Sequence, residues 1–296
     1  MRQQHTIRAE VRIEGIGLHT GRPCAVLLRP AARDTGVVFV RKGVRVPATL
    51  KAVAESAFCT TLAEDGVKVR TVEHLLAALA GLGVDNLLVQ VQGPEIPILD
   101  GSAQGFARQI LQVGLAPQRS PRPHLEILRP FAFKEGHAEF YVLPYPGRRI
   151  TYVAHFPHRL MGLRQMSLEL TPQSFLKEVA PARTFGFLRD VQRLRAKGLA
   201  RGGSLENAVV FSETGVLNPG GLRFHDEFLR HKLLDFLGDL SLLGFPIRGY
   251  ILAKRTGHKS NVRFAQALLR AQEVWQVRTS PEEKEETSRL NYLSQA

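Results

Sequence analysis

The chain of 296 residues has two cysteines, one tryptophan and no long apolar run. Cys24 and Cys59 are too few for the disulfide framework of a small secreted protein, and they fit a reducing compartment. No apolar stretch approaches the roughly 18 residues that a membrane span requires. The first residues, Met1 to Thr6, lack the apolar region of a secretory signal. These absences predict a globular, cytoplasmic protein.

Acidic residues are outnumbered, because 40 Lys and Arg against 27 Asp and Glu give a net charge of +13. Such an excess favours anionic partners: nucleic acid, phosphorylated small molecules or acidic lipid headgroups. The basic residues are spread along the chain, without interleaved aromatic residues or a nucleic-acid-binding motif. We therefore expect no nucleic-acid partner, and a basic nucleic-acid-binding protein is the main non-enzymatic alternative.

The order of expected elements predicts an α+β protein in two halves. The first half has strands at 6–14 and 24–28, β-rich pieces within 36–70, a helix from an N-cap at Thr71 to about Gly83, a strand at 86–91 and a helix at 102–113. Residues 117–123 read as a proline-rich linker. The second half has strands near 125–133, 138–143, 150–156, 208–211 and 249–253, with helices near 172–179, 190–197, 230–240 and 260–274. The predicted domains are therefore 1–118 and 123–275, followed by a polar tail at 276–296.

The leucine-rich helix expected at 230–240 carries three ionisable side chains on one face. At about 100° per residue, His231, Asp235 and Asp239 fall within one stripe. Such groups are costly on an apolar helix unless something pairs them. A divalent metal would do so, since His231 and Asp235 are one turn apart. The alternative is a polar stripe that meets solvent, or a hydrogen bond between neighbouring turns.

A second histidine opens the leucine-rich helix of the first half. His74 begins a run that leads into a strand, as His231 does, which is what a metal site between two similar halves would show. A catalytic zinc site uses three nitrogen or oxygen ligands and one open position, and His74, His231 and Asp235 would supply the ligands. Glu73 would then be a carboxylate beside the metal that accepts a proton from water. Its alternative role is an acid that favours the helix N-terminus.

Three more residues are candidates for the site. His258, in the expected loop after strand 249–253, would act as a general acid or stabilise an oxyanion, with Asp239 raising its pKa. Lys232 fits an anchor for a substrate phosphate or carbonyl. His19 lies in the glycine-rich stretch 15–21, although a loop histidine is more often only solvated.

The motifs together resemble one family, the UDP-3-O-acyl-N-acetylglucosamine deacetylases, which are zinc enzymes of lipid A biosynthesis. They keep the family's order over roughly residues 5–275. The matching stretches are Thr71–Leu75, Pro94–Ala103, Ala182–Phe187, Gly202–Ser204, Leu222–Phe224, His231 through Asp235 to Asp239, and Gly257-His258.

The resemblance implies a fold of two similar domains, each a β-sheet with two helices. The helices of both domains would pack together between the sheets, as in the second domain of ribosomal protein S5. Each domain would carry an insert, at about 36–69 and 186–213, and the second insert would form part of the passage for an acyl chain.

The resemblance also implies the reaction, which is hydrolysis of the acetamide of UDP-3-O-(3-hydroxyacyl)-N-acetylglucosamine, the committed step of lipid A biosynthesis. It assigns Zn²⁺, or Fe²⁺ in the cell, to His74, His231 and Asp235, with Glu73 as general base, His258 as general acid and Asp239 as its orienting partner. It implies that Thr184, Phe185 and Lys232 contact the substrate, and we add His19, from the glycine-rich stretch, as a further candidate contact. The expected partner is a UDP-linked acylated amino sugar, bound by a monomer. The net charge of +13, to which the resemblance gives no meaning, suggests the separate hypothesis of contact with an anionic lipid-linked substrate near a membrane surface. An enzyme acting on another N-acyl amino sugar is the enzymatic alternative.

Overall fold

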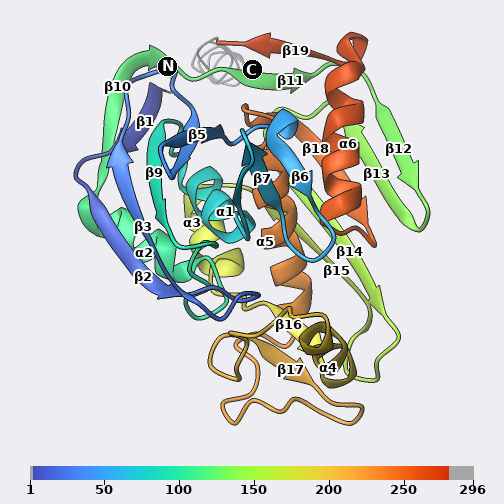
Figure 1. The fold of residues 1–296 in the computed structure, drawn as a ribbon. Coiled ribbons are helices and arrows are strands. Elements are labelled where there is room, and N and C mark those ends of the chain that lie inside the picture. Colours follow the sequence, from blue (N-terminus) through green and yellow to red (C-terminus); the bar gives the residue numbers. More distant parts are fainter. Residues whose placement is uncertain (1–2, 280–296) are drawn as a thin grey trace.

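The computed structural model describes residues 3–279, and within that range it contains six α-helices and five separate β-sheets (Figure 1). This mixture confirms the α+β class expected from the sequence. Within residues 3–279, no helix is long and apolar enough to cross a membrane. Cys24 and Cys59 are both free thiols, as their small number predicted.

The first large sheet has five strands in the order β2 (Val11–Ile16), β3 (Pro23–Pro30), β9 (Leu87–Gln92), β4 (Val37–Arg41) and β5 (Val44–Pro47). Its pairs are antiparallel except β4 with β9. Val26 and Leu28 on β3 are fully buried, whereas Leu27 between them is half-buried, as expected for a sheet covered on one face. Two helices belong to this half of the chain, α1 (Glu73–Leu82) and α2 (Gln104–Val113).

The second large sheet has seven strands. Its main path runs through β12 (Phe131–Glu135), β13 (Ala138–Leu143), β18 (Ile247–Lys254), β11 (His124–Ile127) and β19 (Trp275–Arg278), while β14 (Arg148–Phe156) pairs with β18 and carries β15 (Gly162–Glu169). Its helices are α5 (Glu227–Ser241) and α6 (His258–Arg270). Phe264 of α6 stacks on Phe140 of β13 at a centroid distance of 4.3 Å, so aromatic packing fixes α6 against the sheet.

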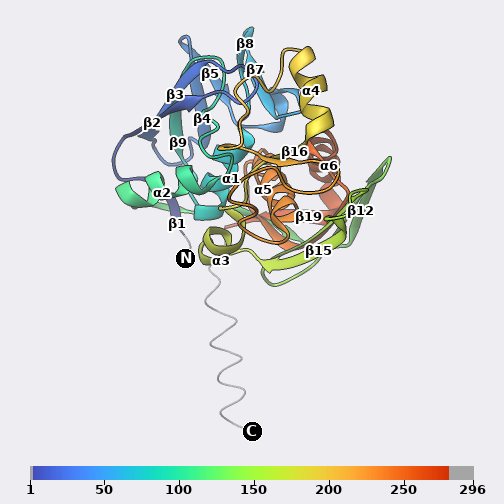
Figure 2. The same ribbon diagram turned by 90° about the horizontal axis from the view of Figure 1, so that it is seen from below.

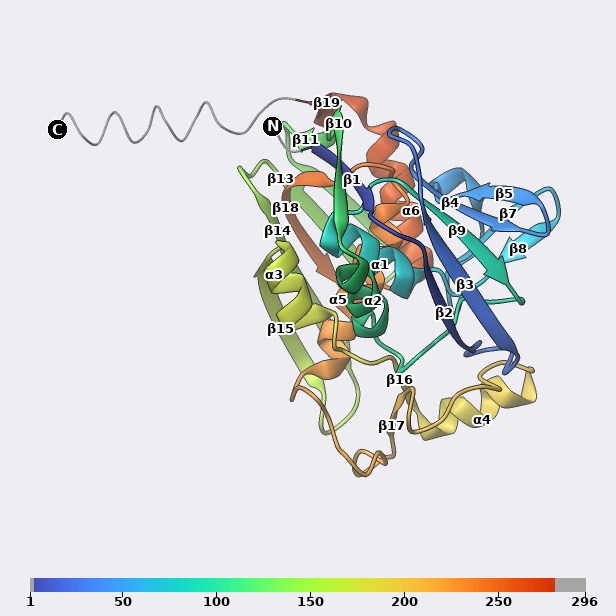
Figure 3. The same cartoon turned by 90° about the vertical axis from the view of Figure 1, so that its left-hand side faces the viewer.

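Helices α1 and α5 pack against each other between the two large sheets (Figure 3). Gly238 marks their close approach, because a Cβ at this position would lie 2.2 Å from the carbonyl oxygen of Glu73. A glycine at the crossing of two helices lets their backbones come into contact. Side chains that flank the crossing on the two helices then lie next to each other. This contact positions the residues described below.

Smaller elements surround this frame. Strand β1 (Gln3–Ile7) pairs with β10 (Leu115–Pro121), and β6 (Val53–Glu55), β7 (Thr61–Glu64) and β8 (Val67–Val69) form a three-stranded sheet after the short helix η1 (Leu50–Ala52). Strand β16 (Phe185–Phe187), helix α4 (Leu188–Ala196) and strand β17 (Val209–Phe211) project from one end (Figure 1), and the view from below shows α4 at the edge of the molecule (Figure 2). Helix α3 (Pro172–Ser174) continues into a π-helical turn, η2 (Phe175–Val179), and η3 (Gln272–Val274) leads into β19.

The structure corrects several expected boundaries. The strand expected at 6–14 is two strands, β1 and β2, and the one expected at 125–133 is β11 followed by β12. The expected linker is mostly strand β10, which pairs with β1. The expected tail begins with a strand, since β19 pairs antiparallel with β11, and residues 280–296 lie outside the described range.

Thr71 does not cap α1. Val72 occupies the N-cap position, and no side chain accepts a hydrogen bond from the first turn. The Thr71 backbone has a φ of 58°, and its hydroxyl donates to Oε1 of the buried Glu95 at 2.7 Å. The predicted end of the helix is confirmed, because Gly83 closes α1 with a φ of 78°.

Candidate metal centre and catalytic site

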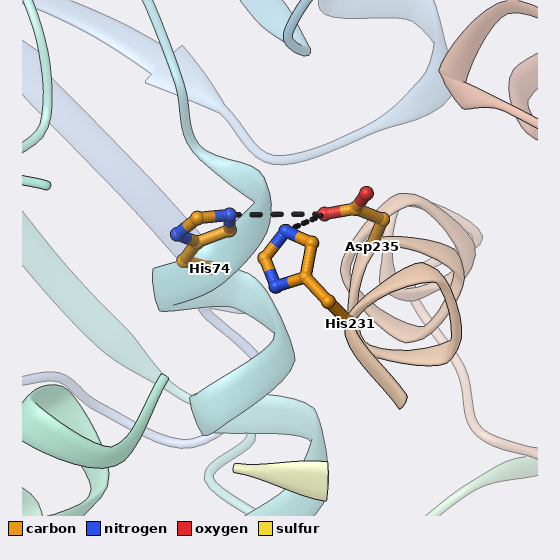
Figure 4. Close-up of side chains that lie close together, drawn as sticks. All are labelled: His74, His231 and Asp235. Carbon is orange, nitrogen blue, oxygen red and sulfur yellow. Dashed lines mark ion pairs between the residues drawn. The ribbon is translucent and has the colours of Figure 1, made fainter. Parts of the chain in front are cut away.

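The structure brings together the three residues expected to bind a metal. His74 comes from the first turn of α1, and His231 and Asp235 come from successive turns of α5. Nε2 of His231 lies 3.2 Å and Nε2 of His74 lies 3.7 Å from Oδ1 of Asp235 (Figure 4). The two imidazole rings meet edge to face, with centroids 4.9 Å apart. All three side chains are buried, so the face of α5 does not meet solvent.

The chemistry of these donors fits a divalent cation. Ligand atoms bound to tetrahedral zinc at about 2.0–2.1 Å lie roughly 3.3 Å from one another. The two imidazole nitrogens lie at a similar distance from Oδ1 of Asp235, 3.2 Å for His231 and 3.7 Å for His74. Nδ1 of His231 lies 3.0 Å from the carbonyl oxygen of Ala182, and donation to that oxygen leaves Nε2 unprotonated toward Asp235. Nδ1 of His74 has no hydrogen-bond partner within the described range. The three donor atoms lie within 4.8 Å of one another and could hold a metal ion.

The protonation states also suit ligation. Burial lowers the pKa of His74 to about 3, and the neighbouring His231 adds to the shift, so the His74 imidazole is neutral. Burial alone would raise the pKa of Asp235, but His231 and Lys232 hold it well below its usual range. The site therefore presents a neutral imidazole and an ionised carboxylate, which are forms that a cation binds.

Lys232 pairs with the second oxygen of the Asp235 carboxylate. Its Nζ lies 2.6 Å from Oδ2. Burial alone would lower the pKa of Lys232, but Asp235 raises it above the usual value, so the ammonium group stays charged. Lys232 was expected to anchor substrate, and here its ammonium lies beside the candidate metal ligands.

A second cluster, formed by Glu73, His258 and Asp239, adjoins the three candidate ligands. Nδ1 of His258 lies 2.8 Å from Oδ2 of Asp239, and Nε2 of His258 lies 3.9 Å from Oε1 of Glu73. The same Nε2 is 3.9 Å from Oδ2 of Asp235. His258 begins α6 rather than lying in the expected loop, and the rigid helix fixes its backbone.

The pKa values of Glu73 and His258 are both raised. Burial raises the pKa of Glu73 to about 8, opposed by His258 and reinforced by Asp235. Burial alone would lower the pKa of His258, but the carboxylates of Asp239 and Asp235 raise it to about 9. A buried carboxyl group and a charged imidazole in van der Waals range form a pair able to accept and donate protons near neutral pH. Glu73 is buried, so a role limited to an exposed helix N-terminus does not describe it.

Two residues of this cluster were missed by the sequence reasoning. Thr60 donates its hydroxyl to Oδ1 of Asp239 at 2.5 Å and its backbone N–H to Oε2 of Glu73 at 3.0 Å. Asn261 donates its amide to Oδ2 of Asp239 at 2.8 Å. The i, i+3 spacing of His258 and Asn261 could have indicated Asn261, because both face the same side of a helix. Nothing in the sequence around Thr60 places it near Asp239.

The remaining candidates lie around this centre in different ways. His19 is buried, not solvated, and neither ring nitrogen has a hydrogen-bond partner in the described part of the chain. Burial lowers its pKa below the usual value. Phe185 lies near His231, with ring centroids 6.4 Å apart and an edge-to-face arrangement. Thr184 is held by its backbone, since its N–H donates to the carbonyl of Gly101 at 2.7 Å.

A cavity of about 450 Å³ lies elsewhere between the two halves of the chain. Its walls include Leu76 and Leu79 of α1 and Leu237 and Leu240 of α5. No candidate site residue lines it, so this cavity is distinct from the His74–His231–Asp235 centre.

Comparison with known proteins supports the family resemblance. Residues 4–270 match the model of the UDP-3-O-acyl N-acetylglycosamine deacetylase family. A protein of Thermodesulfovibrio yellowstonii named UDP-3-O-acyl-N-acetylglucosamine deacetylase is 46% identical over 268 residues, which are 90% of this chain and 91% of that protein. Proteins of the same name from Nitratidesulfovibrio vulgaris (45% identical, covering 90% of this chain and 87% of that protein) and Chromohalobacter salexigens (40% identical, 100% and 99%) also match. The chain therefore belongs to the UDP-3-O-acyl N-acetylglycosamine deacetylase family.

Proposed function

We propose that this protein is a zinc-dependent deacetylase of lipid A biosynthesis that hydrolyses the acetamide of UDP-3-O-(3-hydroxyacyl)-N-acetylglucosamine. The products are the free amine and acetate. Membership of the family and the names of the relatives support the reaction. The buried His74, His231 and Asp235, with donor atoms within 4.8 Å of one another, support a metal-dependent mechanism.

In the proposed mechanism, His74, His231 and Asp235 hold the cation. A divalent ion held there would supply Lewis acidity to the amide carbonyl and would lower the pKa of a nearby water. Glu73 accepts the proton of the attacking water, and a positive ion beside it favours the ionised carboxylate that this step needs. Protonated His258 donates its Nε2 proton to the departing amine.

Asp239 acts through His258. Its carboxylate accepts from Nδ1 of the imidazole, which fixes the ring and directs Nε2 toward Glu73 and Asp235. Thr60 and Asn261 donate to the same carboxylate and so hold Asp239 in place. For substrate contacts we propose Thr184 on the acetyl carbonyl, Phe185 and Lys232 on the glucosamine and UDP groups, and His19 as a further polar contact.

The proposal depends mainly on one observation, the convergence of ligands from α1 and α5 beside the Glu73–His258 pair. Metal analysis of the purified protein, combined with measurement of acetate release from the nucleotide-linked substrate, tests it. We expect about one zinc ion per chain and one acetate per amine formed. His74→Ala should lose both metal and activity, whereas the exposed His137→Ala should retain both. Bound metal without acetate release would favour the alternative hypothesis, an enzyme that acts on another N-acyl amino sugar. A metal-free wild-type protein with full activity would refute the mechanism.

We also propose the two-domain, S5-like classification, with domains at 1–118 and 123–275 and inserts at about 36–69 and 186–213. The five-stranded sheet with α1 and α2, and the seven-stranded sheet with α5 and α6, support this division. The cytoplasmic location, the monomeric state and the use of iron in the cell stay predictions.

A further inference from the structure

One end of the molecule exposes several leucines. This leucine patch lies on the β14–β15 hairpin and on the segment that contains β16, α4 and β17, which share one end of the molecule in Figures 1 and 3. Its members keep the following exposures: Leu160 39%, Leu163 60%, Leu188 43%, Leu205 41% and Leu217 40%. Several exposed leucines gathered at one end of a molecule are a candidate contact surface, provided that the segments that carry them are joined.

Packing and hydrogen bonds join the two segments into one surface. The ring of His158, in the hairpin, lies 5.7 Å from Phe187 and 5.6 Å from Phe211. Its Nε2 is 2.7 Å from the carbonyl oxygen of Ser212. Leu188 directly follows Phe187. Asn218, next to Leu217, donates to the carbonyl oxygen of Leu205 at 2.7 Å, so these two loops also lie together.

Basic side chains accompany the leucines. Residues 156–164 and 185–217 contain seven basic and three acidic residues, a local net charge of +4. The basic residues are Arg159, Arg164, Arg189, Arg193, Arg195, Lys197 and Arg201, and the acidic ones are Asp190, Glu206 and Glu213. Helix α4 has no buried residue, and it combines Leu188 with exposed arginines. Exposed leucine next to Arg and Lys is the composition of segments that lie in the interface of an anionic membrane.

We propose that the leucine patch docks on a bilayer that contains anionic lipid. The leucines enter the boundary between headgroups and acyl chains, and the arginines contact lipid phosphates. Nucleic acid is less suited to this surface, because phosphate contacts would gain nothing from exposed leucines. The patch adjoins Phe185 and Phe187, and Phe185 lies 6.4 Å from His231, so docking holds the candidate catalytic centre near the lipid phase.

The proposal goes beyond the proposed function, because binding to vesicles requires neither metal nor turnover. The test is flotation of the full chain with vesicles of phosphatidylcholine, with and without phosphatidylglycerol. We expect binding only to the anionic vesicles and loss of binding at high salt. Leu163→Ser should weaken partitioning about tenfold, because burying most of a leucine side chain contributes about that factor. Arg164→Gln should weaken it about fivefold.

Matched controls come from another part of the chain. Leu128, which is 44% exposed, and the neighbouring exposed Arg129 lie between β11 and β12. Leu128→Ser and Arg129→Gln should bind vesicles as the wild type does. Leu160→Ser provides a second patch variant, and thermal unfolding checks that each variant is folded.

Three outcomes would overturn the proposal. The first is a wild-type chain that does not float with anionic vesicles. The second is equal partitioning of Leu163→Ser and Leu128→Ser. The third is tight RNA binding that Arg164→Gln abolishes and Leu163→Ser leaves intact, which would assign the surface to nucleic acid.

Discussion

Replacement of Gly238 by alanine tests whether the α1–α5 contact builds the metal centre. In an open helix this change would stabilise the protein by about 1 kcal/mol, because alanine has the higher helix propensity. Here the new Cβ would lie 2.2 Å from the carbonyl oxygen, 2.9 Å from the carbonyl carbon and 3.0 Å from Cα of Glu73. These are backbone atoms that cannot rotate away, so the helices must separate by about 1 Å.

The expected cost follows from this displacement. Overpacking typically destabilises by about 1–3 kcal/mol, which for a chain of this size lowers the melting temperature by roughly 3–10 °C. Because Glu73 and His74 move with α1 while His231 and Asp235 stay on α5, metal affinity should also fall. A displacement of about 1 Å can reduce turnover about 100-fold.

The assay combines thermal unfolding, metal content after dialysis and the rate of acetate release. Gly105→Ala on α2 is the matched control, because its Cβ would meet the flexible end of Leu99, at 2.7 Å from Cδ1. That side chain can rotate, so we expect little loss of stability or metal. If Gly238→Ala melts at or above the wild-type temperature with a full complement of metal, the reasoning about the helix contact is wrong.

Four further predictions concern the catalytic groups and the metal. Glu73→Gln should lower turnover by about two to four powers of ten while metal content stays unchanged, and a near-normal rate of acetate release would contradict its role as base. The pH–rate profile should rise as Glu73, with a pKa raised to about 8, loses its proton, and fall as His258, with a pKa raised to about 9, loses its own; a bound cation moves the first limb to lower pH. Asp239→Asn removes a carboxylate that raises the pKa of His258, so the falling limb should move to lower pH, and an unmoved limb would argue against that coupling. Chelation should abolish acetate release and stoichiometric Zn²⁺ should restore it, measured on the same sample; activity that survives complete metal removal would exclude the proposed centre.

The sequence predicted those parts of the site that depend on local periodicity. One helical face carries His231, Asp235 and Asp239, and spacing alone indicated it. The approach of His74 depends on packing between two helices that are far apart in the chain, and only the echo of motifs and the family resemblance suggested it. Thr60 was out of reach for the same reason, since its partners Glu73 and Asp239 lie on two other elements.

The boundary errors also have physical causes. The proline-rich segment after residue 115 looked like a linker, yet Pro117 and Pro121 are paired with β1 in a two-stranded sheet. Proline is tolerated at such an edge, where its missing N–H need not be bonded. Residues 8–10 contain no glycine or proline, so the break between β1 and β2 left no signal in the alternation of side chains.

Thr71 illustrates how a tertiary partner overrides a local preference. Threonine favours the N-cap, but the buried carboxylate of Glu95 needs donors. It obtains them from the Thr71 hydroxyl, from the backbone N–H groups of His19 and Thr20, and from the Thr20 hydroxyl. The sequence around Thr71 does not reveal that Glu95 needs hydrogen-bond donors.

Thr60 has a consequence for how the two proton-transferring groups are tuned. Its backbone holds the Glu73 carboxylate and its hydroxyl holds Asp239, which in turn orients His258. Thr60 therefore links the proposed general base, Glu73, to the proposed general acid, His258, through Asp239. Movement of the short connection between β6 and β7 would therefore disturb Glu73 and His258 together. Substitutions in that connection would then shift both limbs of the pH–rate profile, not one limb alone.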